Sequence, residues 1–118
     1  MSPTDRVLGP HTTALIGLDG GRYPAGNTVL VRGRDGTAII DPSTSLRTRD
    51  DLPHVDHVLL THTHEDHVAG VHHFPDARVL VHEADLIGIR SVDGLLQMFG
   101  MHGAVADAFR ETLQRDFT

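Results

Sequence analysis

The sequence predicts an α/β domain in which short strands come first and helices follow. Apolar runs of a few residues, separated by glycine, proline and aspartate, fill the amino-terminal half, a pattern typical of strands. The last third carries longer stretches with apolar residues at helical spacing. A segment dense in histidine, residues 61–70, lies between them. With 118 residues there is room for one small domain, and we expect a single domain over residues 1–118.

The amino-terminal half predicts a sheet. Residues 1–11 show little periodicity and predict a loose lead-in. Asp35 and Gly36 lie between two apolar runs and predict a hairpin, because glycine accepts the positive φ that such a turn needs. We expect strands at residues 12–18, 27–32 and 37–41, with Val29, Val31, Ile39 and Ile40 in the sheet core.

After this hairpin, helical or loop segments are predicted to alternate with strands. Residues 43–51 are polar and predict a short surface helix or loop, which Pro53 ends. Residues 55–60 predict a strand, and its run Val58-Leu59-Leu60 is continuous enough for burial on both faces. A helix from Asp66 to about His73 and a strand at residues 78–81 are expected next.

The carboxy-terminal part predicts helices. Residues 83–89 and 92–99 form two of them, with Ser91 or Asp93 as the cap of the second. Residues 104–117 predict a longer amphipathic helix that needs a partner surface. Its apolar face is expected to consist of Val105, Ala108, Phe109 and Leu113.

The segment Thr-His-Thr-His-Glu-Asp-His, residues 61–67, carries a candidate metal site. Imidazole nitrogens and carboxylate oxygens are ligands for zinc, and four such side chains fall within six residues: His62, His64, Asp66 and His67. Residues two apart on an extended segment point to the same side, so His62 and His64 can converge on one ion. If the chain then bends into a helical turn, Asp66 and His67 can reach a second position. The spacing indicates two metal sites served by one loop.

This His-x-His-x-Asp-His signature after an apolar strand resembles that of the metallo-β-lactamase fold hydrolases. Residues 26–31 and 38–42 are similar to the opening hairpin of that family and to its strand-end aspartate, here Asp41, which lies near the metal site. The resemblance implies an αββα sandwich built from two similar halves. It covers most of this chain but only the first half of the family's domain, so we expect an N-terminal half of that fold.

The resemblance also implies a cofactor and a reaction. Two zinc ions are expected in the complete domain, the first on His62 and His64 and the second on Asp66 and His67, while iron or manganese stays open. Asp66 would also be catalytic, because it would orient the nucleophile and carry a proton to the leaving group. A metal-bound hydroxide would attack a small-molecule ester, thioester, lactone, lactam or phosphodiester. The absence of cysteine favours the histidine type, as in glyoxalase II and lactonases, over lactamases with a cysteine ligand.

The ligand set is expected to be incomplete. The family takes further histidines and a bridging aspartate from its second half, and nothing after His67 matches those motifs. We therefore expect the chain to be inactive alone, and to need its missing C-terminal half or a second copy as a partner. Two alternatives stay open: a non-catalytic metal-binding module that dimerises through residues 104–117, and a redox protein that carries iron. Six further histidines are expected at the surface or at helix ends: His54, His57, His72, His73, His82 and His102.

Composition narrows the class of protein. The formal charge of −6, with no run of basic residues, argues against a nucleic-acid surface. The absence of cysteine is compatible with a reducing cytoplasm. The amino-terminal residues lack the apolar core of a signal sequence, and no stretch approaches membrane-spanning length. We expect a soluble cytoplasmic protein.

Overall fold

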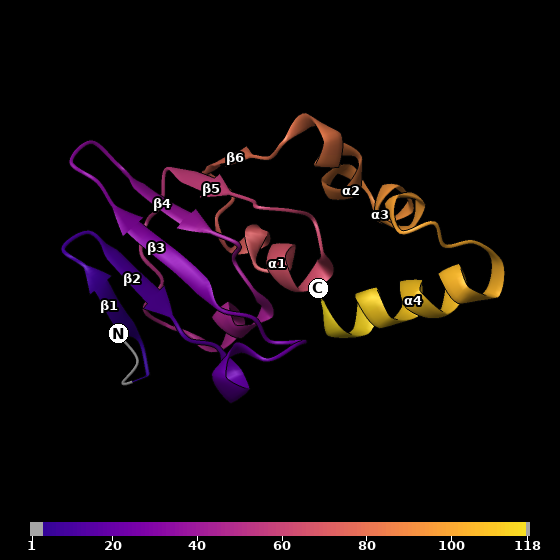
Figure 1. Ribbon diagram of the computed structural model, residues 1–118, viewed down its shortest axis with the longest axis horizontal. Coiled ribbons are helices and arrows are strands. Elements are labelled where there is room, and N and C mark those ends of the chain that lie inside the picture. The colour runs from indigo at the N-terminus through magenta and orange to yellow at the C-terminus, as the bar shows by residue number, and fades with distance from the viewer. Residues whose placement is uncertain (1–3, 118) are drawn as a thin grey trace.

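The computed structural model describes residues 4–117, and the strands in that range form one mixed six-stranded sheet (Figure 1). Strands that are neighbours in sequence are neighbours in the sheet. The first four pair antiparallel and the last two join in parallel. Their bounds are β1 Arg6–Gly9, β2 Thr12–Leu15, β3 Thr28–Arg32, β4 Thr37–Ile40, β5 His57–Leu59 and β6 Arg78–Leu80. The predicted α/β class is confirmed.

Four α-helices and four 3-10 helices complete the described chain. The α-helices are α1 Glu65–Val68, α2 Leu86–Arg90, α3 Val92–Met98 and α4 Gly103–Asp116. The 3-10 helices span Leu18–Gly21, Thr44–Thr48, Val71–His73 and Glu83–Asp85. The Ser91 hydroxyl caps α3 by accepting from the Gly94 N–H at 2.9 Å, so Ser91 is the cap, as one of the two predicted alternatives had it.

The predicted hairpin joins β3 to β4. The Gly33 N–H donates to the Gly36 carbonyl at 2.8 Å across the turn, and Leu30 pairs with Ile39 in the register that follows. Leu30, Ile39 and Val58 align on one face of the sheet, and each is at most 3% exposed. This face carries the main core, which Leu46, Val55 and Phe74 also join.

The opposite face of the sheet carries a second apolar row, which runs across five strands in direct register. The row consists of Ala14, Val29, Ile40, Leu59 and Leu80. The first four are half-buried, and Leu80 is 42% exposed. The main core cluster therefore lies on one side of the sheet, and this row, called the open row below, remains partly in contact with solvent.

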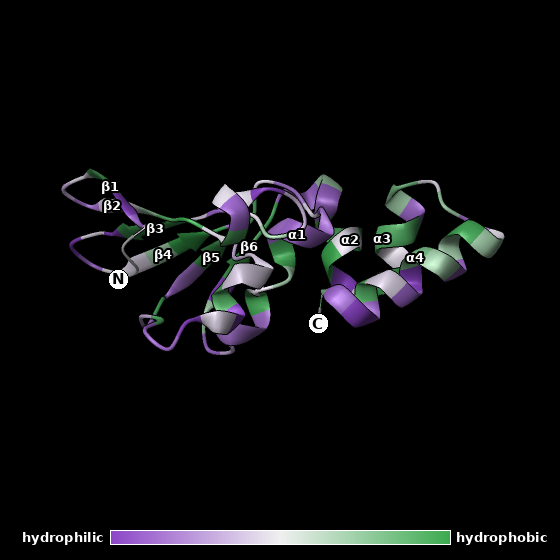
Figure 2. Ribbon diagram, turned by 90° about the horizontal axis from the view of Figure 1, so that it is seen from below, coloured by the Kyte–Doolittle hydropathy of each residue, from purple (hydrophilic) through white to green (hydrophobic). Residues whose placement is uncertain are grey.

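The helices form the other end of an elongated molecule of 48 × 30 × 21 Å (Figures 1 and 2). α1 lies between the sheet and the helices α2 to α4. A second apolar cluster joins the end of α1 to α3 and α4 through Ala69, Leu95, Leu113 and Phe117, which are all buried. No helix in the described part of the chain is both long and apolar enough to cross a membrane.

Two predicted stretches near the sheet differ from the structure. Part of the expected lead-in, residues 6–9, is strand β1, while residues 1–3 lie outside the described range. β1 pairs with β2 at the sheet edge through its main chain, and its side chains are mostly exposed. Its sequence therefore lacks the alternation of apolar and polar residues by which a half-buried strand is predicted. The stretch 43–51, expected at the surface, contains buried Thr44, Ser45 and Leu46, because Leu46 inserts into the main core.

Burial also differs from the prediction at β5 and in the helices. Leu59 is half-buried, because β5 is covered on the Val58 face alone. The helix expected from Asp66 to His73 breaks near Gly70 into α1 and a 3-10 turn. In α4, Ala106 and Leu113 are buried, whereas Val105 is 64% exposed. The face that packs is thus rotated from the predicted one.

Candidate metal centre

The histidine-rich segment crosses the end of the sheet beside Asp41. β4 and β5 run parallel, so their carboxyl ends meet at one edge, a common place for sites in α/β folds. The Thr61 N–H donates to Asp41 Oδ1 at 2.8 Å, and the Thr61 hydroxyl donates to Asp41 Oδ2 at 2.6 Å. These two bonds tie the start of the segment to the neighbouring strand.

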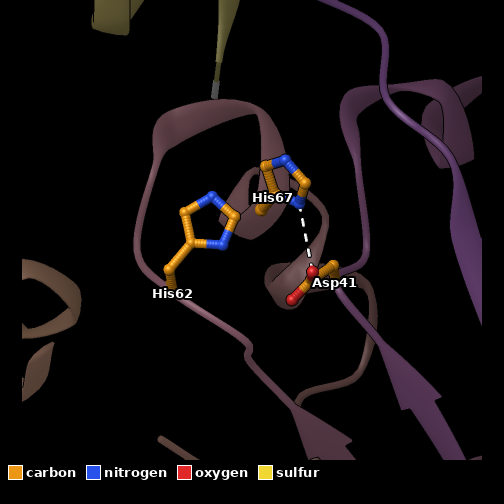
Figure 3. Close-up of side chains that lie close together, drawn as sticks. All are labelled: Asp41, His62 and His67. Atoms are coloured by element: carbon orange, nitrogen blue, oxygen red, sulfur yellow. Dashed lines mark hydrogen bonds and ion pairs between the residues drawn. The ribbon is translucent and has the colours of Figure 1, made fainter. Parts of the chain in front are cut away.

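Asp41, His62 and His67 converge at this edge (Figure 3). Each offers one ligand atom, and these three atoms lie within 4.8 Å of one another. The two imidazole rings are 4.2 Å apart between centroids, and His67 Nδ1 lies 3.1 Å from Asp41 Oδ2. Asp41 is buried and both histidines are half-buried. Two imidazoles and a carboxylate are a donor set that zinc accepts, so these residues, called the metal triad below, fit a divalent cation.

Hydrogen bonds orient both imidazoles of the metal triad. The Thr61 hydroxyl has one hydrogen, which it gives to Asp41, so it accepts from His62 Nδ1 at 2.8 Å. His67 Nδ1 donates to the Asp41 carboxylate, which only accepts when ionised. Both rings then carry their hydrogen on Nδ1, and the Nε2 lone pair of each is available to a metal. Such bonds to the second nitrogen fix the tautomer and the ring orientation of metal-binding histidines.

Main-chain geometry places Asp41 and α1 side by side. Asp41 has a φ of 52°, a left-handed conformation that aspartate adopts more readily than most residues. The Gly70 N–H, just after α1, donates to the Pro42 carbonyl at 2.8 Å. A Cβ on Gly70 would lie 2.6 Å from the Ser43 carbonyl oxygen, so only glycine permits this approach. The contact holds α1 against the turn after β4, which brings His67 over Asp41.

The other two predicted ligands lie beside the metal triad. Asp66 Oδ2 is 3.5 Å from His67 Nε2, and its side chain is 15% exposed. The His64 ring is 4.7 Å from that of His62, but it also packs against Phe99 at 5.2 Å between centroids and is exposed. The structure therefore brings His62 and His67 together with Asp41, and leaves His64 and Asp66 at the margin of the group. Their assignment as ligands stays a prediction.

Sequence reasoning missed two polar partners of this segment. Thr61 directly precedes the motif, and its role depends on Asp41, 20 residues away. Glu65, inside the motif, is buried and accepts from the Tyr23 hydroxyl at 2.8 Å. The position of Thr61 beside the first histidine could have marked it, whereas no local pattern pairs Glu65 with a residue 42 positions away.

The remaining histidines lie outside the metal triad. His82 Nδ1 accepts from the Ala84 N–H at 3.0 Å and caps a 3-10 helix, in agreement with the expected helix-end role. His54, His72 and His102 are exposed, also as expected. His73 is half-buried, and its Nε2 has no hydrogen-bond partner within residues 4–117. Burial, reinforced by the nearby His72, lowers the pKa of His73 below its usual value.

This lowered pKa predicts a pH-dependent stability. In the unfolded chain His73 titrates near pH 6.5, and in the folded protein its pKa is below that value. At a pH between these two pKa values, the unfolded state therefore binds more protons than the folded state. The free energy of unfolding is therefore expected to fall as the pH drops from about 6.5 toward the folded pKa. Urea unfolding of the metal-free protein at pH 7.5 and 5.5 measures this loss. His73→Gln should show a smaller loss than wild type, and His102→Gln, at an exposed position, the same loss as wild type; equal losses in all three would contradict the prediction.

Comparison with known proteins supports the class that fold and site indicate. The family model of the metallo-beta-lactamase superfamily matches residues 21–91, more than half of the chain. The protein belongs to this superfamily, which confirms the resemblance noted in the sequence. The matched range contains both the strand-end aspartate and the histidine-rich segment. Neither a curated protein nor a solved structure matches the chain.

Proposed function

We propose that this protein is the metal-binding part of a hydrolase, with a di-zinc centre on the histidine-rich segment. One observation carries the proposal: Asp41, His62 and His67 place their ligand atoms within 4.8 Å of one another in a chain of the metallo-beta-lactamase superfamily. Asp41 follows β4, His62 follows β5 and His67 lies in α1, so three separate elements bring a donor atom to one partly exposed point. A shared cation gives them a reason to converge there.

The residues around this point have different proposed roles. His62 and His67 would bind through Nε2, and His64 and Asp66 would complete a pair of sites. Bound zinc supplies a Lewis acid and lowers the pKa of a coordinated water. Asp41 and Thr61 hold the two rings in position. Asp66, beside His67, would orient the attacking group and carry its proton to the leaving group.

The proposed substrates are small molecules with a carbonyl or phosphoryl centre: esters, thioesters, lactones, lactams and phosphodiesters. The cysteine-free composition favours a histidine-type hydrolase and a cytoplasmic location. Metal analysis after dialysis tests the first part, and hydrolysis assays with one substrate of each class test the second. Zinc binding with turnover of one class supports the proposal. Zinc binding with no turnover, alone or with a C-terminal half, favours the non-catalytic metal-binding module. Absence of bound metal contradicts both.

We also propose that the open row packs against a second sheet. Its five apolar residues lie in one register across β2 to β6 and remain partly exposed. Burial of apolar surface contributes about 25 cal/mol per Å², so covering this row would stabilise the domain. A carboxy-terminal half of the fold or a second copy of the chain would supply the covering sheet.

The open row predicts self-association of the chain when no other sheet covers it. Size-exclusion chromatography should give a species larger than a monomer, and Leu59→Lys should shift it toward the monomer because a charge on the row opposes burial. Val7→Lys changes an exposed residue outside the row and should leave the elution volume unchanged. A monomeric wild-type peak with cooperative melting would overturn this part.

A further inference from the structure

A hollow lies on the helical side of α1, and the residues of the metal triad do not line it. It is a groove of about 560 Å³ between α1 and the helices α2, α3 and α4, within the size range of small-molecule sites. Most of its walls are apolar side chains, among them Val68, Ile89, Leu95 and Leu113. None of Asp41, His62 and His67 lines it.

One charged residue borders this groove. Glu65 is 8% exposed, and its Oε2 is buried without a hydrogen-bond partner among residues 4–117. Its other oxygen, Oε1, accepts from the Tyr23 hydroxyl at 2.8 Å. Partial desolvation and this hydrogen bond raise the pKa of Tyr23 to about 12, so the phenol is a donor at neutral pH. Burying a carboxylate oxygen without a donor is unfavourable. A ligand that donates a hydrogen bond to Oε2 would therefore remove this cost.

Tyr23 contacts this carboxylate through its hydroxyl, and a second aromatic ring lies near Tyr23. The rings of Tyr23 and Phe117 are 6.1 Å apart between centroids, and Phe117 also lines the groove. Aromatic faces attract cations, and together with a carboxylate they favour a positively charged group over an anion. The formal charge of −6 on the chain acts in the same direction.

We propose that this groove binds an organic amine with an apolar tail. The Glu65 carboxylate would turn toward the groove so that its unpaired Oε2 accepts from the ammonium group, and the tail would lie along Leu95 and Leu113. This site would be separate from the metal centre and independent of the proposed hydrolase activity.

A pair of probes with one skeleton and opposite charge tests the proposal. 4-Phenylbutylamine and 4-phenylbutyrate are titrated into the metal-free, ¹⁵N-labelled full chain, and amide shifts report where each binds. We expect the amine to shift the amides of Ala69, Leu95 and Leu113, and to bind about tenfold more tightly than the carboxylate, because its donor is charge-assisted. Equal affinities, no shifts, or shifts centred on His62 would overturn the proposal.

Matched variants separate the buried carboxylate from the overall charge. Glu65→Gln should reduce the affinity for the amine about tenfold and leave the carboxylate probe nearly unchanged. Glu111→Gln removes the same charge from an exposed position on α4 and should bind both probes as wild type does. An equal loss in the two variants would show attraction by net charge and would overturn the site. The wild-type comparison of the two probes remains decisive if Glu65→Gln does not fold.

Discussion

His62→Ala is expected to lower the affinity for zinc by more than about 100-fold, because loss of a residue that only orients a metal ligand already costs about 10–100-fold. His62 contributes one of the two imidazoles of the metal triad, and its ring is held by the Thr61 hydroxyl. Alanine removes this ligand and leaves His67 as the one imidazole of the metal triad, still oriented by Asp41. Competition titration against a zinc-binding dye measures the change.

A second histidine variant separates this effect from non-specific binding. His102 is exposed and makes no side-chain cap at the start of α4. His102→Ala should therefore keep the affinity of the wild-type protein. Equal affinities of wild type and His62→Ala would show that zinc binds elsewhere and would remove the basis of the proposed hydrolase.

Local patterns were sufficient to predict most of the sheet. The Asp35-Gly36 turn between two apolar runs defines β3 and β4, because the turn is encoded within a few residues. The same holds for the Ser91 cap, which needs a hydroxyl three residues before the amide that it accepts from. Elements that are fixed by a local turn or by a local cap are therefore predictable from the sequence alone. The core face was predicted only in part: Ile39 is buried as expected, whereas Val29, Val31 and Ile40 are half-buried and Leu30 takes the core position.

Elements that depend on distant partners were not predictable in the same way. β1 has exposed side chains and exists through main-chain pairing with β2. The buried face of α4 is set by Ala69 and Leu95, which lie on other elements. Gly70 ends α1 early because its amide bonds to Pro42 on the turn after β4. Each of these depends on tertiary contacts rather than on local propensity.

The residues of the candidate site fall into the same two groups: those that a local pattern predicts and those that tertiary contacts bring in. The His-x-His-x-Asp-His spacing marks four side chains as ligands, and it lies within six residues. The structure adds Asp41 to His62 and His67, a convergence set by the parallel pairing of β4 and β5. Only the resemblance to a known family placed Asp41 near the metal site beforehand. The motif thus marks His62 and His67, whereas Asp41 lies outside it and joins them only through the pairing of the strands.

Asp41→Asn is expected to weaken both folding and metal binding. The carboxylate accepts from the Thr61 amide, the Thr61 hydroxyl and His67 Nδ1. Asparagine keeps the shape and tolerates the positive φ, but its NH₂ group cannot accept, so partly buried donors on Thr61 and His67 lose a partner. We expect a loss of about 1–2 kcal/mol in the free energy of unfolding, toward the lower end of the cost of about 1–3 kcal/mol for a buried unsatisfied donor, because these donors are only partly buried. Zinc affinity should fall about 10–100-fold, as for other residues that orient a ligand.

Thr61→Val gives the graded comparison for this network. It removes only the hydroxyl, keeps the Thr61 amide on Asp41 Oδ1 and releases the His62 ring. Its cost in stability should be about 1 kcal/mol, because of the two hydrogen bonds of this hydroxyl only the one to Asp41 is partly buried and the one to His62 is exposed to water. The loss of zinc affinity should be smaller than in Asp41→Asn. Urea unfolding and the dye titration measure the two quantities on the same samples. If Asp41→Asn bound zinc like wild type while Thr61→Val did not, Asp41 would have no part in orienting His67, and the hydroxyl of Thr61 alone would control the site.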